Sequence, residues 1–137
     1  MINLRSLLTE ILKNEIPQEL YHVTFRKYAK NITTNGLVPG GIENKLLLKF
    51  FRIFNRNLGV YLCDDVEISL KYIMYREGVN INELVVFKIF TENLDHNLFE
   101  FDKKLDKRLV VDGHVVQSFI YKGVISPDNI ILAWPQN

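Results

Sequence analysis

The chain has little of several residue types, and each shortage excludes a class of protein. Its single cysteine, Cys63, rules out an intramolecular disulfide, so a reducing, cytoplasmic setting is expected. No apolar run is long enough to span a membrane, and the N-terminus lacks the pattern of a signal peptide, so no membrane partner is expected. The formal net charge is only +1, which gives no general case for nucleic-acid binding.

The composition that remains is that of an ordinary globular domain. The chain has 137 residues, 47% of them hydrophobic and 24% charged, which suits one domain with one core. Only two alanines stand beside many Asn, Ile and Lys residues, which hints at an AT-rich bacterial or phage genome. A local basic face is still compatible with the low net charge, because four basic residues fall in one short stretch: Lys45, Lys49, Arg52 and Arg56.

Residues 1–17 predict an amphipathic helix that precedes a single domain over residues 18–137. The apolar residues of this segment recur at helical spacing, and Pro17 ends the helix because the residue before proline disfavours the helical conformation. The helix could pack on its own domain or dock against a partner, and the sequence does not choose between these alternatives. Its apolar stripe consists of Leu4, Leu7, Leu8, Ile11 and Leu12.

The rest of the chain predicts short, interspersed helices and strands. Without the regular alternation of a doubly wound sheet, this order favours an α+β fold with mostly antiparallel strands. Helices are expected over residues 25–37, capped by Thr24 and ended by Gly36, and over 64–78, capped by Asp64 or Asp65 with Ile68, Tyr72 and Tyr75 on one face. A third helix is expected over 45–57, and residues 97–108 are expected to be polar and irregular. Strands are expected over 19–24, 59–65, 83–93, 114–123 and 129–134.

His22 stands alone as a titratable residue in the apolar strand LYHVT (20–24), and three later patches give it a context. These are GLVP (36–39), GVYL (59–62) and GVISPDNI (123–130). In this order the four patches resemble the ADP-ribosyltransferase-like domains that bind NAD, a superfamily that includes toxin-like and poly-ADP-ribose-polymerase-like transferases and RNA 2′-phosphotransferases. The resemblance implies an ADP-ribosyltransferase-like α+β fold: two small, facing, mostly antiparallel sheets plus helices, with His22 and Tyr61 on adjacent strands that line one cleft.

The resemblance also implies binding roles for three residues. His22 would hydrogen-bond the adenosine ribose, and Thr24 would lie near the nicotinamide amide. Tyr61 would stack on the nicotinamide ring. Arg26 follows the His22 strand at an expected helix N-terminus, which favours an anion, so it could contact the diphosphate. From the residues alone, His22 could equally be a core histidine satisfied by a carbonyl, Tyr61 a core aromatic, and Arg26 a solvated surface residue.

The sequence departs from the family where its transferases carry a glutamate. The matching positions are Gln117 and Ser118, and neither side chain can stabilise positive charge as a carboxylate does. Three explanations stay open. The protein binds NAD or ADP-ribose without turnover; it uses an acceptor that is already an anion; or another acid serves, with Glu100, Asp102 and Asp112 as candidates.

The expected function is therefore transfer of ADP-ribose from NAD to an unknown protein or nucleic-acid acceptor. The alternatives are a non-catalytic NAD, ADP-ribose or protein-binding module and an RNA 2′-phosphotransferase-like activity, for which Arg26, Arg52 and Arg56 could contact a diphosphate or an RNA acceptor. No metal is expected, because the spacing of His22, His96, His114 and Cys63 is not that of a zinc site.

Overall fold

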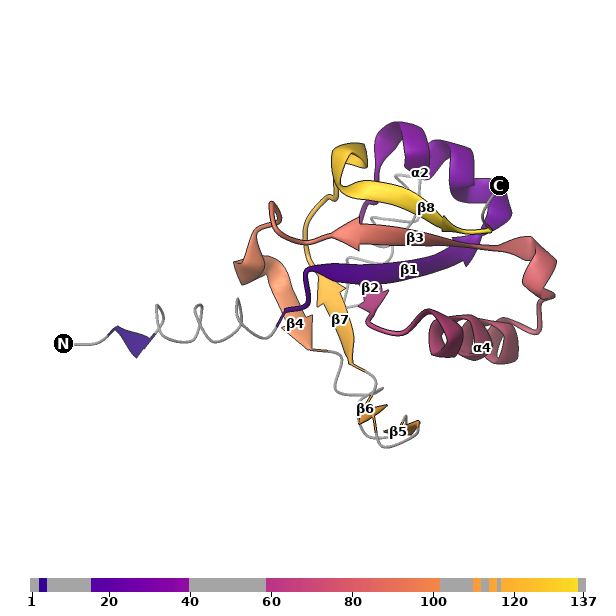
Figure 1. Ribbon diagram of the computed structural model, residues 1–137. Helices are drawn as coiled ribbons and strands as arrows, with labels where there is room; N and C mark the ends of the chain where they lie inside the picture. Colours follow the sequence, from indigo (N-terminus) through magenta and orange to yellow (C-terminus); the bar gives the residue numbers. More distant parts are fainter. Residues whose placement is uncertain are drawn as a thin grey trace, which may run out of the picture.

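The computed structural model describes residues 3–4, 16–39, 59–101, 110–111, 114–115 and 117–135. Within these ranges the chain forms a sheet with one helix on each side (Figure 1). The helices are α2 (Ala29–Asn35) and α4 (Val66–Glu77), with short 3-10 turns η1 (Arg26–Tyr28), η2 (Ile81–Glu83), η3 (His96–Leu98) and η4 (Pro127–Asn129). The strands are β1 (Glu19–Phe25), β2 (Val60–Cys63), β3 (Leu84–Phe90), β4 (Phe99–Phe101), β5 (Val110–Val111), β6 (His114–Val115), β7 (Ser118–Tyr121) and β8 (Ile130–Trp134).

The predicted α+β class with antiparallel strands is confirmed, but the expected two facing sheets are replaced by one six-stranded sheet and a separate hairpin. The strand order of the sheet is β4-β7-β2-β1-β3-β8, and β5 pairs with β6. The six strands count as one sheet because β1 and β2 stay paired at a single point, Tyr21 opposite Cys63. On either side of this seam the halves differ in direction: β1, β3 and β8 run across Figure 1, whereas β4 and β7 run steeply to them.

The main core lies on the side of the sheet that α2 covers. Strand alternation sends Leu20 of β1 and Val60 and Leu62 of β2 into this core, where they meet the fully buried rings and branched side chains of β3 and β7. Ile16 is also buried there, and the carbonyl of Pro17 accepts a hydrogen bond from the hydroxyl of Thr91 at 2.6 Å. The residues just before position 18 therefore belong to the packed domain.

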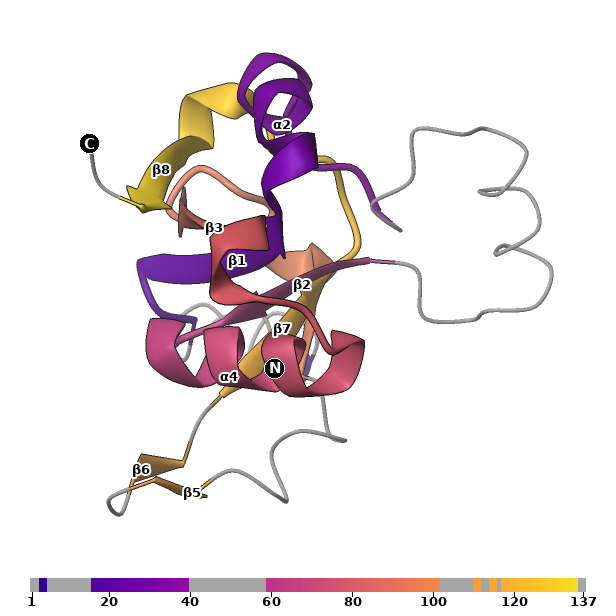
Figure 2. The ribbon, with the colours of Figure 1, turned by 90° about the vertical axis from the view of Figure 1, so that its right-hand side faces the viewer.

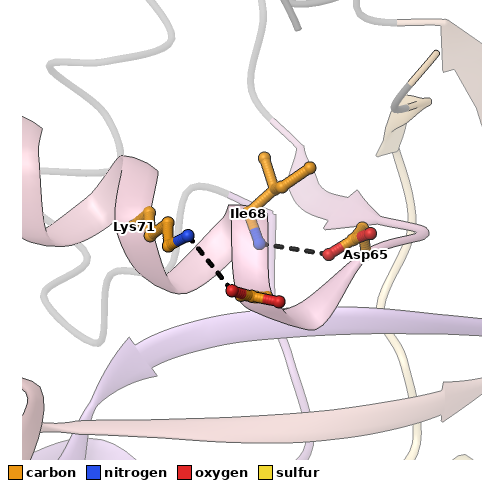
Figure 3. A network of polar contacts seen from close by, with 4 residues as sticks. Asp65, Ile68 and Lys71 are labelled. Carbon is orange, nitrogen blue, oxygen red and sulfur yellow. Dashed lines mark hydrogen bonds and ion pairs between the residues drawn. The ribbon is translucent and has the colours of Figure 1, made fainter. Parts of the chain in front are cut away.

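A second, smaller core lies under α4, on the opposite side of the sheet from α2 (Figure 2). The helix begins as predicted: the carboxylate of Asp65 accepts the amide of Ile68 at 3.1 Å, and Glu67 pairs with Lys71 one turn on (Figure 3). It ends at Gly78, which has φ 63°. The packed face is formed by Val66, Leu70, Ile73 and Met74.

The predicted face of this helix is wrong in one respect. Ile68 is buried as expected, but Tyr75 is 91% exposed, because the residues that meet the sheet are offset from it around the helix. The side chain of Tyr72 lies outside the described part of the structure.

The helix predicted over residues 25–37 starts later than expected. Thr24 continues β1, opposite Val85, instead of capping a helix, and the chain then makes the 3-10 turn η1 before α2 begins at Ala29. The strand extends because every residue of β1 from Glu19 to Phe25 finds a partner in β3. The predicted end at Gly36 is confirmed: its φ is 84°, and its amide donates to the carbonyl of Ile32 at 2.8 Å.

Two glycines fix the chain on either side of residues 40–58. After Gly36, Leu37 exchanges backbone hydrogen bonds of 2.9 Å with Ile125, and a Cβ on Gly36 would come within 2.1 Å of the Ile125 carbonyl oxygen. Gly59 packs as closely, since a Cβ there would lie 2.2 Å from Cγ2 of Ile120. Both sites need glycine for close backbone approach.

Two strands, β4 and the two-residue β5, are not anticipated by the sequence analysis. Phe99–Phe101, read as part of a polar, irregular segment, forms β4 and pairs with β7, because the buried ring of Phe99 packs against Phe119 and Tyr121. Several expectations fall outside the described residues: most of the N-terminal helix, the helix over 45–57 with Arg52 and Arg56, and the acids Asp102 and Asp112. No helix in the described ranges is long and apolar enough to cross a membrane.

Candidate functional site

His22 lies at the seam where β1 and β2 part. Beyond the pair of Tyr21 and Cys63, no further residue of β1 is paired with β2. In place of another rung of the ladder, Nδ1 of His22 lies 2.9 Å from the backbone carbonyl oxygen of Tyr61. A side chain thus bridges the two halves of the sheet at the point where the backbone ladder stops.

This contact fixes the tautomer of the imidazole. A carbonyl oxygen can only accept, so Nδ1 of His22 carries the proton and donates it to Tyr61, and Nε2 of the neutral ring is left as an acceptor. Desolvation of the half-buried side chain lowers the pKa of His22, and the hydrogen bond to the Tyr61 carbonyl opposes this in part. The neutral ring is therefore favoured, and its Nε2 suits a hydroxyl donor.

Tyr61 lies on β2, the neighbouring strand, and its side chain points to the opposite face of the sheet from that of His22. In β2, Val60 and Leu62 are buried while Tyr61 is 47% exposed. Because Tyr21 pairs with Cys63, alternation places the Tyr61 ring on the face of Tyr21 and His22 on the face of Leu62. The expected placement on adjacent strands is observed, but a single face shared by both side chains is not. A ligand that contacted both would have to lie at the seam.

Thr24 and Arg26 extend the site along β1 and its end. Thr24 is half-buried on the same face as His22 and Leu20. Arg26 opens η1 and is exposed, with no carboxylate partner among the described residues. The helix N-terminus expected beside Arg26 is a three-residue turn instead, so it adds little dipole field for an anion.

Gln117 lies beside a carboxylate that the sequence analysis does not connect with it. The amide of Gln117 donates to Oδ1 of Asp64 at 3.1 Å, and the amide of Asp64 donates to the carbonyl of Gln117 at 3.1 Å. These reciprocal bonds join the end of β2 to the start of β7. From the sequence, Asp64 is a candidate only for a helix cap, a role that Asp65 fills. The two residues are 53 positions apart, and no sequence signal indicates their contact.

Ser118, the other position matching the family's acid, is buried in the sheet. Its hydroxyl donates to the carbonyl of Leu62 at 3.3 Å, and the residue pairs with Cys63 of β2. A role in holding β7 to β2 explains this geometry, and Gln117 is the more accessible of the two positions. Burial raises the pKa of the Cys63 thiol, with hydrogen bonds from Ser69 and Asp65 opposing this, so the thiol stays protonated and is a poor nucleophile.

The other acids named from the sequence do not reach this site. Glu100 is on β4, where its carboxylate lies 3.6 Å from the ammonium of Lys122, and Asp102 and Asp112 lie outside the described residues. In the described part of the chain, no three His, Cys, Asp or Glu side chains gather as metal ligands would.

Comparison with models of known families and with curated proteins found no match to this chain. The four sequence patches and the seam between β1 and β2 are therefore the features from which a function can be inferred.

Proposed function

We propose that this domain binds NAD at the seam between β1 and β2 and transfers its ADP-ribose to a macromolecular acceptor. The observation that supports this best is the His22 ring, which is held by the Tyr61 carbonyl with Nε2 left as an acceptor. A ribose hydroxyl is a donor of the kind that Nε2 requires. The resemblance of the four patches gives the same residue the same task.

In this proposal the two strands serve different ends of the dinucleotide. His22 accepts a hydrogen bond from the adenosine ribose, with Thr24 beside it on β1. Tyr61, exposed on β2, offers its ring to the nicotinamide, a planar group that gains from aromatic contact. Arg26, exposed and without a described carboxylate partner, supplies positive charge for the diphosphate. Because His22 and Tyr61 leave their strands on different faces, the dinucleotide crosses the seam.

The chemistry requires the bond between nicotinamide and ribose to break through a transition state with oxocarbenium character. Fixed negative charge near the ribose lowers this barrier. The Gln117 amide carries no charge, but the carboxylate of Asp64 is bonded to its backbone amide, so negative charge is fixed next to this position. Nicotinamide leaves with the bonding electron pair, and the acceptor then forms the new bond to the ribose carbon and releases its proton to water.

A non-catalytic module is the second candidate, and Gln117 is the observation that favours it. An amide can hydrogen-bond a ribose hydroxyl and so keep binding while losing turnover. An RNA 2′-phosphotransferase-like activity would need several arginines near the site. Among the described residues, Arg26 is the one arginine near it.

Binding is tested by the shift in melting temperature of the full chain with NAD, because a ligand that binds only the folded state stabilises it. We expect a rise for wild type, a smaller rise for His22→Ala and Tyr61→Ala, and an unchanged rise for Tyr75→Ala, a matched exposed tyrosine on α4. An unmoved wild-type midpoint at millimolar NAD would rule out the proposed binding.

Turnover is tested separately by release of nicotinamide and by labelling of a lysate with labelled NAD. Gln117→Glu should raise the rate, since it places a carboxylate where the family's transferases have one, and fixed charges of this kind are worth roughly 3 kcal/mol. Ser118→Glu is the companion variant, expected to disrupt the sheet because Ser118 is buried. If wild type and Gln117→Glu both bind NAD and release no nicotinamide, the non-catalytic module is the correct interpretation.

A further inference from the structure

The charges of this protein are unevenly distributed along the chain. Between residues 20 and 58 there are seven Lys or Arg residues and one acidic residue, Glu43, whereas the rest of the chain has ten basic and fifteen acidic residues. The small net charge of +1 therefore conceals a basic segment, and it does not argue against a polyanionic partner for that segment.

The structure describes the first part of this segment, η1 and the start of α2. Arg26, Lys27 and Lys30 are exposed there, and none of them pairs with a carboxylate in the described structure. η1 contacts the η2 turn, which carries Glu83, whose carboxylate accepts the amide of Asn80 at 3.1 Å. In the described structure, the basic side chains of η1 and α2 therefore form no ion pair, with Glu83 or with any other carboxylate.

Lysines elsewhere in the described structure are paired instead. Lys71 lies 3.1 Å from Glu67, Lys88 lies 3.6 Å from Glu19, and Lys122 lies 3.6 Å from Glu100. The domain therefore has one surface, at η1 and the start of α2, whose basic side chains form no ion pairs, and other surfaces whose lysines are paired with carboxylates.

An aromatic group is fixed among these unpaired charges. Tyr28 is 39% exposed, and its ring meets the ring of Phe25 edge-on, with centroids 6.2 Å apart and planes at 74°. The ammonium of Lys27 lies 5.1 Å from the Tyr28 centroid and 5.6 Å from that of Phe25. A ring held in place by two neighbours is a ready stacking platform, because less side-chain freedom is lost when a ligand binds.

We propose that the part of this basic surface formed by Lys27, Tyr28 and Lys30 binds single-stranded nucleic acid, which is the acceptor of the transferred ADP-ribose. Lysine and arginine contact phosphates, and an exposed aromatic ring stacks on an unpaired base; single strands offer both at once. A duplex keeps its bases stacked, and the carboxylates that give an acidic protein segment its charge are not themselves attached to a flat ring that Tyr28 could stack on. The surface follows β1 directly in the chain. A nucleic acid bound there therefore lies next to the end of β1, the β-strand that carries His22. The assignment as acceptor rests on the proposed transferase function, whereas the binding itself does not.

The binding is tested by fluorescence anisotropy of a short labelled single strand with the full chain, at several salt concentrations and without NAD. The Lys27→Gln/Lys30→Gln variant should bind more weakly and reduce the slope of log affinity against log salt by about 1.4, because each neutralised phosphate of a single strand contributes roughly 0.7 to that slope. The matched control, Lys71→Gln/Lys122→Gln, removes the same charge from paired positions and should leave the slope near that of wild type. An equal reduction of the slope in both double variants would overturn the proposed surface.

The nature of the partner is tested by a second pair of variants and by competitors. Tyr28→Ala should weaken binding at least about fivefold, the usual minimum when a base–aromatic stack is removed, while Tyr75→Ala should not. Unlabelled single strand should displace the probe better than a duplex or polyglutamate of equal charge. Equal displacement by polyglutamate, with no effect of Tyr28→Ala, would replace nucleic acid with an acidic protein as the partner.

The acceptor assignment is tested last, with labelled NAD and the same oligonucleotide. Transfer of label to the strand by wild type, reduced in Lys27→Gln/Lys30→Gln although its melting shift with NAD is unchanged, supports it. A strand that binds but is never labelled, while labelled NAD marks protein in a lysate, overturns the acceptor assignment alone. A strand that binds when NAD shows no melting shift overturns the proposed function and leaves the binding surface in place.

Discussion

Strand β1 has two very different neighbours. On the side of β3, all seven of its residues are paired, from Glu19 opposite Phe90 to Phe25 opposite Leu84. On the side of β2, one residue is paired, and the His22 side chain makes the next contact. The same strand is therefore fully paired along one edge and paired at only one residue along the other. A fold can hold a binding residue precisely by anchoring one edge of its strand and releasing the other.

The largest expected effect tests the rigid side. Phe87 pairs with His22 and is 1% exposed in the main core. Phe87→Ala should lower the free energy of unfolding by about 3–5 kcal/mol, because it leaves a cavity among packed side chains. Urea unfolding followed by circular dichroism measures this, with Phe87→Leu as the milder control. A decrease below about 1 kcal/mol would mean that the β1–β3 side is not the stable half of the comparison.

A smaller effect is expected where β2 meets β7. Asp64→Ala removes the carboxylate that accepts the Gln117 amide, and hydrogen bonds to charged groups contribute about 1.5–3 kcal/mol; partial exposure favours the lower end. Asp64→Asn keeps an oxygen at this position and should restore most of the stability. If the asparagine variant is as unstable as the alanine variant, the charge rather than the hydrogen bond joins the two strands.

Removing the hydrogen bond between His22 and Tyr61 at the seam should lower the free energy of unfolding by less than the two changes above. His22→Ala removes one hydrogen bond to a backbone carbonyl and should reduce stability by about 1 kcal/mol. His22→Asn is a useful companion, since its amide can still donate to the Tyr61 carbonyl. Thermal unfolding of the three proteins without ligand measures the difference. A decrease as large as that of Phe87→Ala would show that the two sides of β1 are equally important for folding.

The pH dependence should be the smallest effect and has a definite sign. Desolvation places the folded-state pKa of His22 below its ordinary value of 6.5, so the unfolded chain binds more protons in this range. Stability from the neutral ring is then fully present above pH 6.5 and declines as the pH falls from 6.5 towards the lowered pKa. The difference in melting temperature between wild type and His22→Ala, followed across this range, should shrink on acidification. A difference that grows on acidification would contradict the lowered pKa.

Most of the elements could be predicted from local patterns in the sequence. The runs of apolar residues around Leu20 and Val86 form strands as expected, and Asp65 and Gly36 mark helix ends because their roles depend on neighbours a few positions away. The start of the helix predicted over residues 25–37 is wrong because pairing with β3 keeps Thr24 extended. Its partner Val85 lies far away along the chain, so no local pattern indicates this pairing. Local propensity yields to such contacts.

The site was less predictable than the fold. The family resemblance implies that His22 and Tyr61 lie on neighbouring strands, but the face of each side chain depends on the register of Tyr21 with Cys63. A shift of one residue would exchange the faces, and no local pattern fixes that register. The contact of Asp64 with Gln117 arises from the same long-range pairing of β2 with β7.

The glycines at positions 36 and 59 are two separate anchors on one stretch of the chain. Gly36 packs against Ile125 and Gly59 against Ile120 and Tyr121, so the backbone at each position is held by its own contacts. A side chain at either glycine would meet an atom of that stretch within 2.2 Å, so each anchor depends on the missing Cβ. These contacts are formed by residues outside 40–58, so evolution or an engineer could change the charge at Lys45, Lys49, Arg52 and Arg56 without altering the residues that form either anchor.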